Sequence, residues 1–168
     1  MTCTIHKGKH RAWPPSFGLF YDKQRMEKVV EFDSTAKYDL SSIDNNDINK
    51  LFGWGYLKGL HHTDSVRFGW NWNQEIGKVN LFAYCYVNRL RLMIPICTVN
   101  INYKYLLQID KIGKKYTLSV LDAGMMYRNY GSMDIMFTHK KKFSYRLGCF
   151  FGGNNPAPHD ITIKILKK

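Results

Sequence analysis

The stretch SVRFGWNWNQEIGKVNLFAYCYV, residues 65–87, decides the fold. It holds two segments of alternating side chains, Ser65–Trp72 and Lys78–Val87. Successive side chains of a β-strand point to opposite faces. One face of this pair therefore carries an apolar set: Val66, Phe68, Trp70, Val79, Leu81, Ala83 and Cys85. The pattern predicts two paired strands with this face in a core.

The opposite face of the two segments combines aromatic rings with arginine and asparagine. An ordinary solvent-facing strand surface carries Lys, Glu and Thr instead, so this face indicates contact with a ligand or a partner. Flat rings beside Asn and Arg donors suit sugars, and Arg also suits uronates or sulfates. A protein interface and packing within the chain are the alternatives. We call the predicted set the ring-and-arginine face: Arg67, Asn71, Asn80, Tyr84 and Tyr86, joined by Arg146 if Tyr145–Phe151 belongs to the same sheet.

The rest of the chain also favours strands, because β-branched and aromatic residues dominate and turn signals recur every dozen residues or so. No internal repeat or linker divides the sequence, so we expect residues 1–168 to form one all-β domain, an antiparallel two-sheet sandwich of jelly-roll type. The expected strands are Lys9–Trp13, Lys28–Phe32, Lys50–Lys58, Ser65–Trp72, Lys78–Val87, Arg89–Ile94, Tyr103–Lys111, Lys115–Leu121, Asp134–Phe137, Tyr145–Phe151 and Asp160–Leu166. The expected core holds Phe68, Trp70, Leu81, Ala83, Cys85, Leu118, Val120, Leu147, Cys149, Ile161, Ile163 and Ile165.

The formal net charge of +12 favours acidic partners. Nucleic acid, acidic polysaccharide and an acidic protein all fit this charge. Lysines are dispersed along the chain, and the single run Lys140–Lys142 is typical of a solvated loop. The sequence lacks the glycine-aromatic signature of RNA-binding modules, so we expect no direct binding of nucleic acid.

Cysteine and histidine spacing gives no metal or redox motif. The four cysteines have no CxxC spacing, and three lie in apolar runs, which predicts reduced core thiols. His61 and His62 are adjacent, so on a strand they would point to opposite faces and could not chelate one ion. We expect no metal or cofactor. No segment has the pattern of a signal peptide or a membrane span, which predicts a protein of a virion or of the producing cell's cytoplasm.

The C-terminal stretch YRLGCFFGGNNPAPHDITIKI, residues 145–165, resembles the closing strands of concanavalin A-like jelly-roll sandwiches. The middle run, Lys50–Val87, does so as well. This architecture occurs in LamG-type modules and polysaccharide lyases, and Gly152–Pro158 occupies the place of its Gly-, Asn- and Pro-rich loop. The chain is also similar in appearance to small phage and prophage proteins. The resemblance implies a concanavalin A-like fold.

The polysaccharide lyases of this fold carry an Arg-rich strand, a Gln-Ile-His strand and a Tyr near the end of the last-but-one strand. If the resemblance extended to activity, it would imply the same three features here. This sequence lacks Gln-Ile-His, reads FFGGN at 150–154 where the tyrosine region is expected, and offers only Arg67 for the arginine. We therefore predict a non-enzymatic binding or assembly module, a virion-associated phage structural protein that contacts other subunits or surface glycans as part of an oligomer. The alternative is a carbohydrate-binding module or a polysaccharide lyase-like enzyme acting on acidic glycans.

Overall fold

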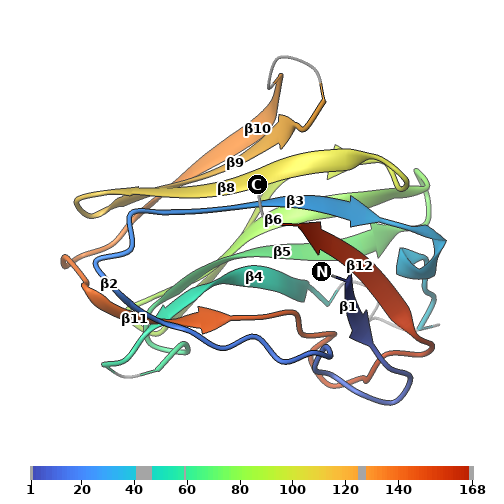
Figure 1. Ribbon diagram of the computed structural model, residues 1–168, viewed down its shortest axis with the longest axis horizontal. Coiled ribbons are helices and arrows are strands. Elements are labelled where there is room, and N and C mark those ends of the chain that lie inside the picture. The colour runs from blue at the N-terminus through green and yellow to red at the C-terminus, as the bar shows by residue number, and fades with distance from the viewer. Residues whose placement is uncertain (1, 41–46, 59, 125–127, 167–168) are drawn as a thin grey trace.

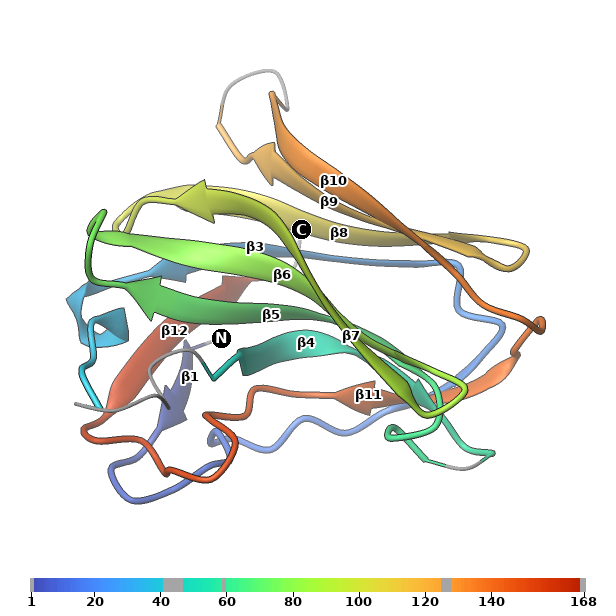
Figure 2. The same ribbon diagram turned by 180° about the vertical axis from the view of Figure 1, so that it is seen from behind.

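A computed structural model describes residues 2–40, 47–58, 60–124 and 128–166 and contains two antiparallel sheets of six strands each, stacked face to face (Figures 1 and 2). The terminal sheet has the order β1 (Thr2–Ile5), β12 (Ile161–Leu166), β3 (Arg25–Phe32), β8 (Lys104–Ile112), β9 (Lys115–Asp122), β10 (Asn129–Met136). The middle sheet has the order β2 (Leu19–Tyr21), β11 (Phe143–Leu147), β4 (Asn49–Tyr56), β5 (Ser65–Asn73), β6 (Lys78–Val87), β7 (Leu90–Val99). A 3-10 turn, η1 (Ser34–Ala36), follows β3.

This arrangement confirms the all-β antiparallel sandwich of concanavalin A-like jelly-roll type. The decisive stretch forms β5 and β6, which pair in antiparallel register with Trp70 opposite Leu81 and Phe68 opposite Ala83. All twelve residues of the expected core are buried, but Leu147 lies outside the core cluster, because it pairs with Gly53 and so faces the Arg67 side of the middle sheet. Within the described ranges, no helix is long and apolar enough to cross a membrane.

Tight hairpin turns join β6 to β7 and β8 to β9. Asn88 and Arg89 join β6 to β7 and have φ angles of 51° and 69°. Positive φ at both central residues is the geometry that matches the right-handed twist of a two-residue hairpin. Gly113, with φ 66°, begins the turn between β8 and β9, where the left-handed region suits glycine.

Two expectations about strands are wrong. The segment Lys9–Trp13 makes only isolated bridges, and the edge strands β1 and β2 form on either side of it instead. Pro14 and Pro15 follow directly and have no N–H to donate to a ladder. The strand expected at Tyr145–Phe151 lies earlier in the chain, as β11, and ends at Leu147.

Candidate anion-binding site

The outer face of the middle sheet brings together five of the six residues of the predicted ring-and-arginine face. Across β5 and β6, Arg67 lies opposite Tyr84 and Asn71 lies opposite Asn80, while Tyr86 is the next residue along this face of β6. The Asn80 Nδ2 group donates a hydrogen bond to Asn71 Oδ1 at 2.9 Å. The pleat therefore separates apolar and polar side chains as expected.

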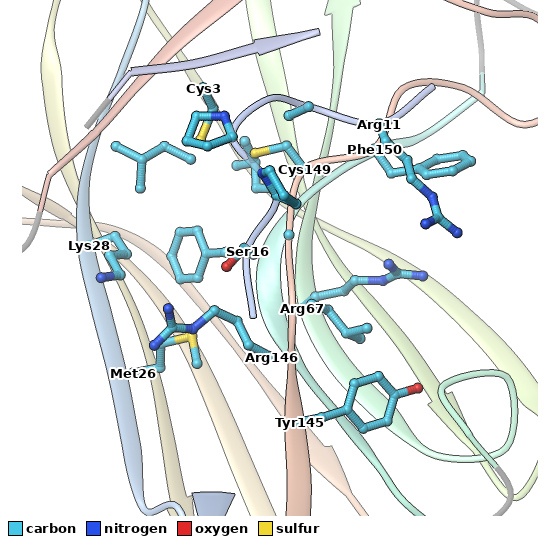
Figure 3. Close-up of a pocket in the computed structure, with 18 of the residues that line it drawn as sticks. Cys3, Arg11, Ser16, Met26, Lys28, Arg67, Tyr145, Arg146, Cys149 and Phe150 are labelled. Carbon is cyan, nitrogen blue, oxygen red and sulfur yellow. The ribbon is translucent and has the colours of Figure 1, made fainter. Parts of the chain in front are cut away.

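Arg146 does not join them, because it lies on the other face. β11 belongs to the middle sheet, but Arg146 pairs with Trp54 and so shares the core-facing side with it. Its guanidinium lies over the Phe20 ring, 5.5 Å from the centroid. Figure 3 shows Arg67 and Arg146 on opposite sides of β11. The preceding residue, Tyr145, pairs with Gly55 and faces the Arg67 side instead.

The ring-and-arginine face is also less open than the sequence suggested. Arg67 and Asn71 are each 7% exposed and Tyr84 is 5% exposed. The cause is stacking within the face: the Arg67 guanidinium lies 5.1 Å and the Lys50 Nζ atom 5.0 Å from the centre of the Tyr84 ring. Such cation–π contacts favour close approach of charged groups to the ring. The result is a recessed site rather than a flat platform.

Two glycines of β4 form the floor of this site. A Cβ atom at Gly53 would lie 2.5 Å from Arg67 Cβ and 2.1 Å from the Val66 carbonyl oxygen. A Cβ atom at Gly55 would lie 3.2 Å from Tyr145 Cζ and 2.9 Å from His61 Cβ. Only glycine leaves enough room for these side chains to lie across the strand. The bare β4 backbone thus allows Arg67, Tyr145 and His61 to approach one another.

Tyr145 and His61 form a hydrogen-bonded pair at the edge of the site. The Tyr145 hydroxyl oxygen accepts a hydrogen bond from the His61 backbone N–H at 2.9 Å and lies 3.0 Å from His61 Nδ1. Burial, followed by the charges of His62 and Arg67, lowers the pKa of His61 to about 4, so its ring is neutral at pH 7. Burial raises the pKa of Tyr145, so it remains protonated. The Tyr145 hydroxyl can therefore donate to Nδ1.

The His61-His62 turn places further rings beside Tyr86. The His61 and His62 rings are 4.2 Å apart, and His62 meets Tyr86 edge-on at 5.3 Å between centroids. Tyr86 in turn contacts Tyr84 at 6.0 Å. In the described part of the chain, no three His, Cys, Asp or Glu side chains are grouped as metal ligands. The ring contacts of His61 and His62 with each other and with Tyr86 form an aromatic wall for the site.

Asp64 holds this turn in place. Its buried carboxylate accepts a hydrogen bond from the Asn88 backbone N–H at 3.0 Å and pairs with Lys141 Nζ at 2.8 Å. The Lys141 side chain is only 17% exposed, so the interpretation of the whole run Lys140–Lys142 as a solvated loop is wrong for its middle residue. One ion pair thus connects the wall of the site to the β6–β7 hairpin and to the segment before β11.

The electrostatics of the site favour an anion. Burial lowers the pKa of Arg67, yet a guanidinium stays protonated in proteins. Its Nε atom is buried without a hydrogen-bond partner, and no carboxylate of the described chain forms a salt bridge with it. It borders a cavity of about 670 Å³ whose described lining residues include no Asp or Glu. The cationic residues that line this cavity are Arg11, Lys28, Arg67 and Arg146.

Sequence reasoning missed Lys50, Tyr145 and the role of His61. Lys50 Nζ donates to the Gly152 carbonyl at 2.8 Å, and burial, together with the charge of Arg67, lowers the pKa of Lys50 to about 8. The face that Lys50 and Tyr145 occupy follows from strand pairing, because Lys50 pairs with Gly69 and Tyr145 with Gly55. The local sequence does not show these pairings. The His61-His62 doublet was visible, but its turn conformation was not.

The sequence matches no family model and no functionally curated protein. The structure is similar to three alginate lyases. The enzyme from Klebsiella pneumoniae aligns with a TM-score of 0.54 at 6% identity, over 99% of this chain and 57% of the lyase. Lyase A1-II′ of polysaccharide lyase family 7 aligns at 0.53 and 7% identity, over 87% of this chain and 60% of the enzyme.

The third lyase, vAL-1 from Chlorella virus, aligns at 0.50 and 13% identity, over 98% of this chain and 81% of that enzyme. The chain thus spans 57% and 60% of the length of the first two lyases. At such low identity the likeness establishes the concanavalin A-like jelly-roll fold and nothing more about this chain.

Proposed function

We propose that the chain is a binding module for acidic polysaccharides, and that Arg67 binds a carboxylate or sulfate of the glycan. The observation that carries the proposal is a buried guanidinium with an unpartnered Nε atom, in a cavity whose described lining residues include no carboxylate. A buried charge is costly unless it is paired. An anionic ligand would supply the missing partner through a charge-assisted hydrogen bond.

The surroundings of Arg67 favour a sugar over other anions. Rings of Tyr86 and His62 offer flat apolar surfaces, and the Asn71–Asn80 amide pair offers donors and acceptors for hydroxyl groups. The net charge of +12 would attract a polyanionic chain from a distance. A protein subunit on this face stays a prediction, as does the virion-associated role. An apolar subunit surface would cover Arg67 without pairing its charge, so we favour the acidic glycan.

Titration calorimetry with alginate, polygalacturonate and heparin tests the proposal, with dextran as the neutral polymer. We expect the wild type to bind at least one acidic polymer and not dextran. Arg67→Gln should weaken that binding about 10-fold or more, the size of a lost charge-assisted hydrogen bond. Affinity should also decline with added salt, since part of the attraction is electrostatic.

Arg146→Gln is the matched control, because it removes the same charge on the opposite side of β11. It should bind the acidic polymer as the wild type does. If the wild type bound none of the three acidic polymers, or if Arg67→Gln bound as tightly as the wild type, the proposal would be refuted.

A second candidate function, β-elimination of a uronate polymer, is favoured by the Tyr145–His61 pair beside Arg67. In this reaction a base removes the proton next to the carboxylate, the C–O bond to the leaving sugar breaks, a C=C bond forms, and the leaving oxygen takes up a proton. Arg67 would neutralise the carboxylate, neutral His61 can accept a proton, and the protonated Tyr145 hydroxyl can donate one. The similar folds are those of alginate lyases.

Incubation with alginate or polygalacturonate tests this candidate, because each elimination leaves an unsaturated sugar that absorbs in the ultraviolet. A lyase should raise the absorbance, and Tyr145→Phe should lower the rate about 100-fold or more while polymer binding persists. A flat absorbance trace with polymers that the protein binds would eliminate the enzyme and leave the binding module.

A further inference from the structure

Part of the large cavity lies between the two sheets, on the core-facing side of β11. It is lined there by Cys3 of β1, Met26 and Lys28 of β3 and Ile165 of β12, all from the terminal sheet. Figure 3 shows Arg146 extending from β11 toward Met26 and Lys28, away from Arg67 and Tyr145. We call this part the interlayer compartment. It is distinct from the polar site on the outer face.

The walls of the interlayer compartment are apolar. Cys3, Met26 and Ile165 belong to the buried core, as do Phe52 and Cys149, which also line the cavity. Hydroxyl groups placed among these side chains would lose their hydrogen bonds to water without replacement, which is costly. An alkyl chain has no such groups and gains from leaving water. The walls therefore select a hydrocarbon over a sugar.

The rim of the compartment is cationic. A second cavity of about 370 Å³ shares Met26, Lys28 and Arg146 with the first, so it adjoins the compartment at this rim. Lys23 Nζ and the Arg146 guanidinium lie 5.0 Å and 5.5 Å from the centre of the same Phe20 ring.

Two further charged residues line the second cavity. Arg25 is paired with Asp110, and Glu27 is the one carboxylate among the described lining residues of this cavity. Within the described chain, neither Lys23 nor Arg146 forms a salt bridge. An aromatic ring attracts cations but does not neutralise them. Positive charge thus predominates where the apolar compartment ends.

We propose that the interlayer compartment binds a medium- or long-chain alkyl carboxylate, with its carboxylate on Arg146 and its chain between the two sheets. Arg146 presents a planar guanidinium that matches a carboxylate, and Lys28 adds positive charge at the same rim. The alkyl chain lies along Met26 and the Cys3 and Cys149 side chains. The compartment is one part of a cavity of about 670 Å³ whose other part borders Arg67 and Tyr145, and the cavity as a whole falls within the usual range of ligand pockets.

Titration calorimetry with octanoate, decanoate and dodecanoate below their micelle concentrations tests this proposal. We expect saturable binding of one molecule per chain, and each additional buried methylene should tighten the affinity about fourfold. Arg146→Gln should weaken dodecanoate binding about 10-fold or more but should leave 1-dodecanol binding unchanged. Circular dichroism and thermal unfolding serve as the check that the variant is folded.

Thiol alkylation gives a second readout that does not depend on any substitution. Hydrogen bonding to Cys149 lowers the pKa of Cys3 to about 7, and Cys3 borders the cavity, so we expect N-ethylmaleimide to reach this buried thiol through the cavity. Dodecanoate should slow alkylation of Cys3, measured by peptide mass spectrometry. Cys97, which lies on β7 away from this compartment, is the internal control: burial raises its pKa to about 11, so it should react slowly and at a rate that dodecanoate leaves unchanged.

Arg67→Gln separates this proposal from the glycan site, because it should keep full affinity for dodecanoate. Absence of saturable dodecanoate binding by the wild type would overturn the alkyl carboxylate, whatever the polysaccharide experiment gives. Equal dodecanoate affinity of the wild type and Arg146→Gln, or alkylation of Cys3 that dodecanoate does not slow, would also overturn it.

Discussion

Arg67→Met is expected to unfold at a higher temperature than the wild type and to lose its affinity for acidic polysaccharides. Arg67 is 7% exposed and, within the described chain, has no carboxylate partner. Replacing buried ionic groups with apolar residues of similar size is often stabilising by about 1–4 kcal/mol. The loss of the cation–π contact with Tyr84 offsets part of this gain. We therefore expect a net gain of about 1 kcal/mol, or roughly 2–4 °C in Tm for a chain of this size.

Differential scanning calorimetry of both proteins without ligand measures this gain, and titration with the best acidic polymer measures the loss of affinity. Arg91→Met is the control, since exposed Arg91 pairs with Tyr86 across β6 and β7 on the same face. Its Tm should change little, because an exposed charge has lost little hydration. A lower Tm for Arg67→Met would contradict the argument that the guanidinium lies buried without its partner.

A gain of stability with a loss of binding would identify Arg67 as a residue kept for function. Binding sites commonly hold groups that weaken the folded state, so replacing them with apolar residues raises stability and removes activity. Gly53 contributes to the same arrangement, because its missing side chain leaves space for Arg67 on the β4 backbone. Strand β5 thus provides a buried guanidinium without a partner at Nε, and Gly53 of β4 provides the space that accommodates it.

The pleat of β5 and β6 was predictable from sequence because period-two alternation places side chains on faces without reference to the rest of the chain. Arg67, Tyr84 and Asn71 were therefore assigned to the correct face. The depth of the site was not predictable in this way. It depends on Lys50 and on the His61-His62 turn, whose positions follow from strand pairing and tertiary contacts.

Arg146 shows how an error in register changes a functional prediction. The strand around it was recognised, and its place in the middle sheet is as expected. A strand's face assignment reverses with a shift of one residue, however, and nothing in the local sequence fixes which residue of β11 lies opposite Trp54. The same error concealed Tyr145, the neighbouring residue that does face Arg67. The pairing partners of a strand, rather than its composition, decide which face of the sheet such residues occupy.

Asp64→Ala is expected to destabilise the protein by about 3 kcal/mol and to loosen the wall of the candidate site. The change removes the partner of Lys141, whose side chain is poorly placed to reach water, and the acceptor of the Asn88 backbone N–H. Breaking a buried pair by removing one member leaves an uncompensated charge, which costs about 3–5 kcal/mol, and the 17% exposure of Lys141 places this case at the lower end. Urea unfolding monitored by tryptophan fluorescence measures the loss.

Two further variants distinguish this mechanism from a general surface effect. Asp134→Ala breaks the exposed pair with Lys115 and should cost at most about 1 kcal/mol. Asp64→Ala combined with Lys141→Met should recover part of the stability, because the second change removes the unpaired charge. Since Asp64 is three residues from His61, the single variant should also bind acidic polymer more weakly than the wild type. Loss of stability equal to that of Asp134→Ala, with unchanged polymer binding, would mean that the ion pair neither supports the fold nor positions the His61-His62 turn.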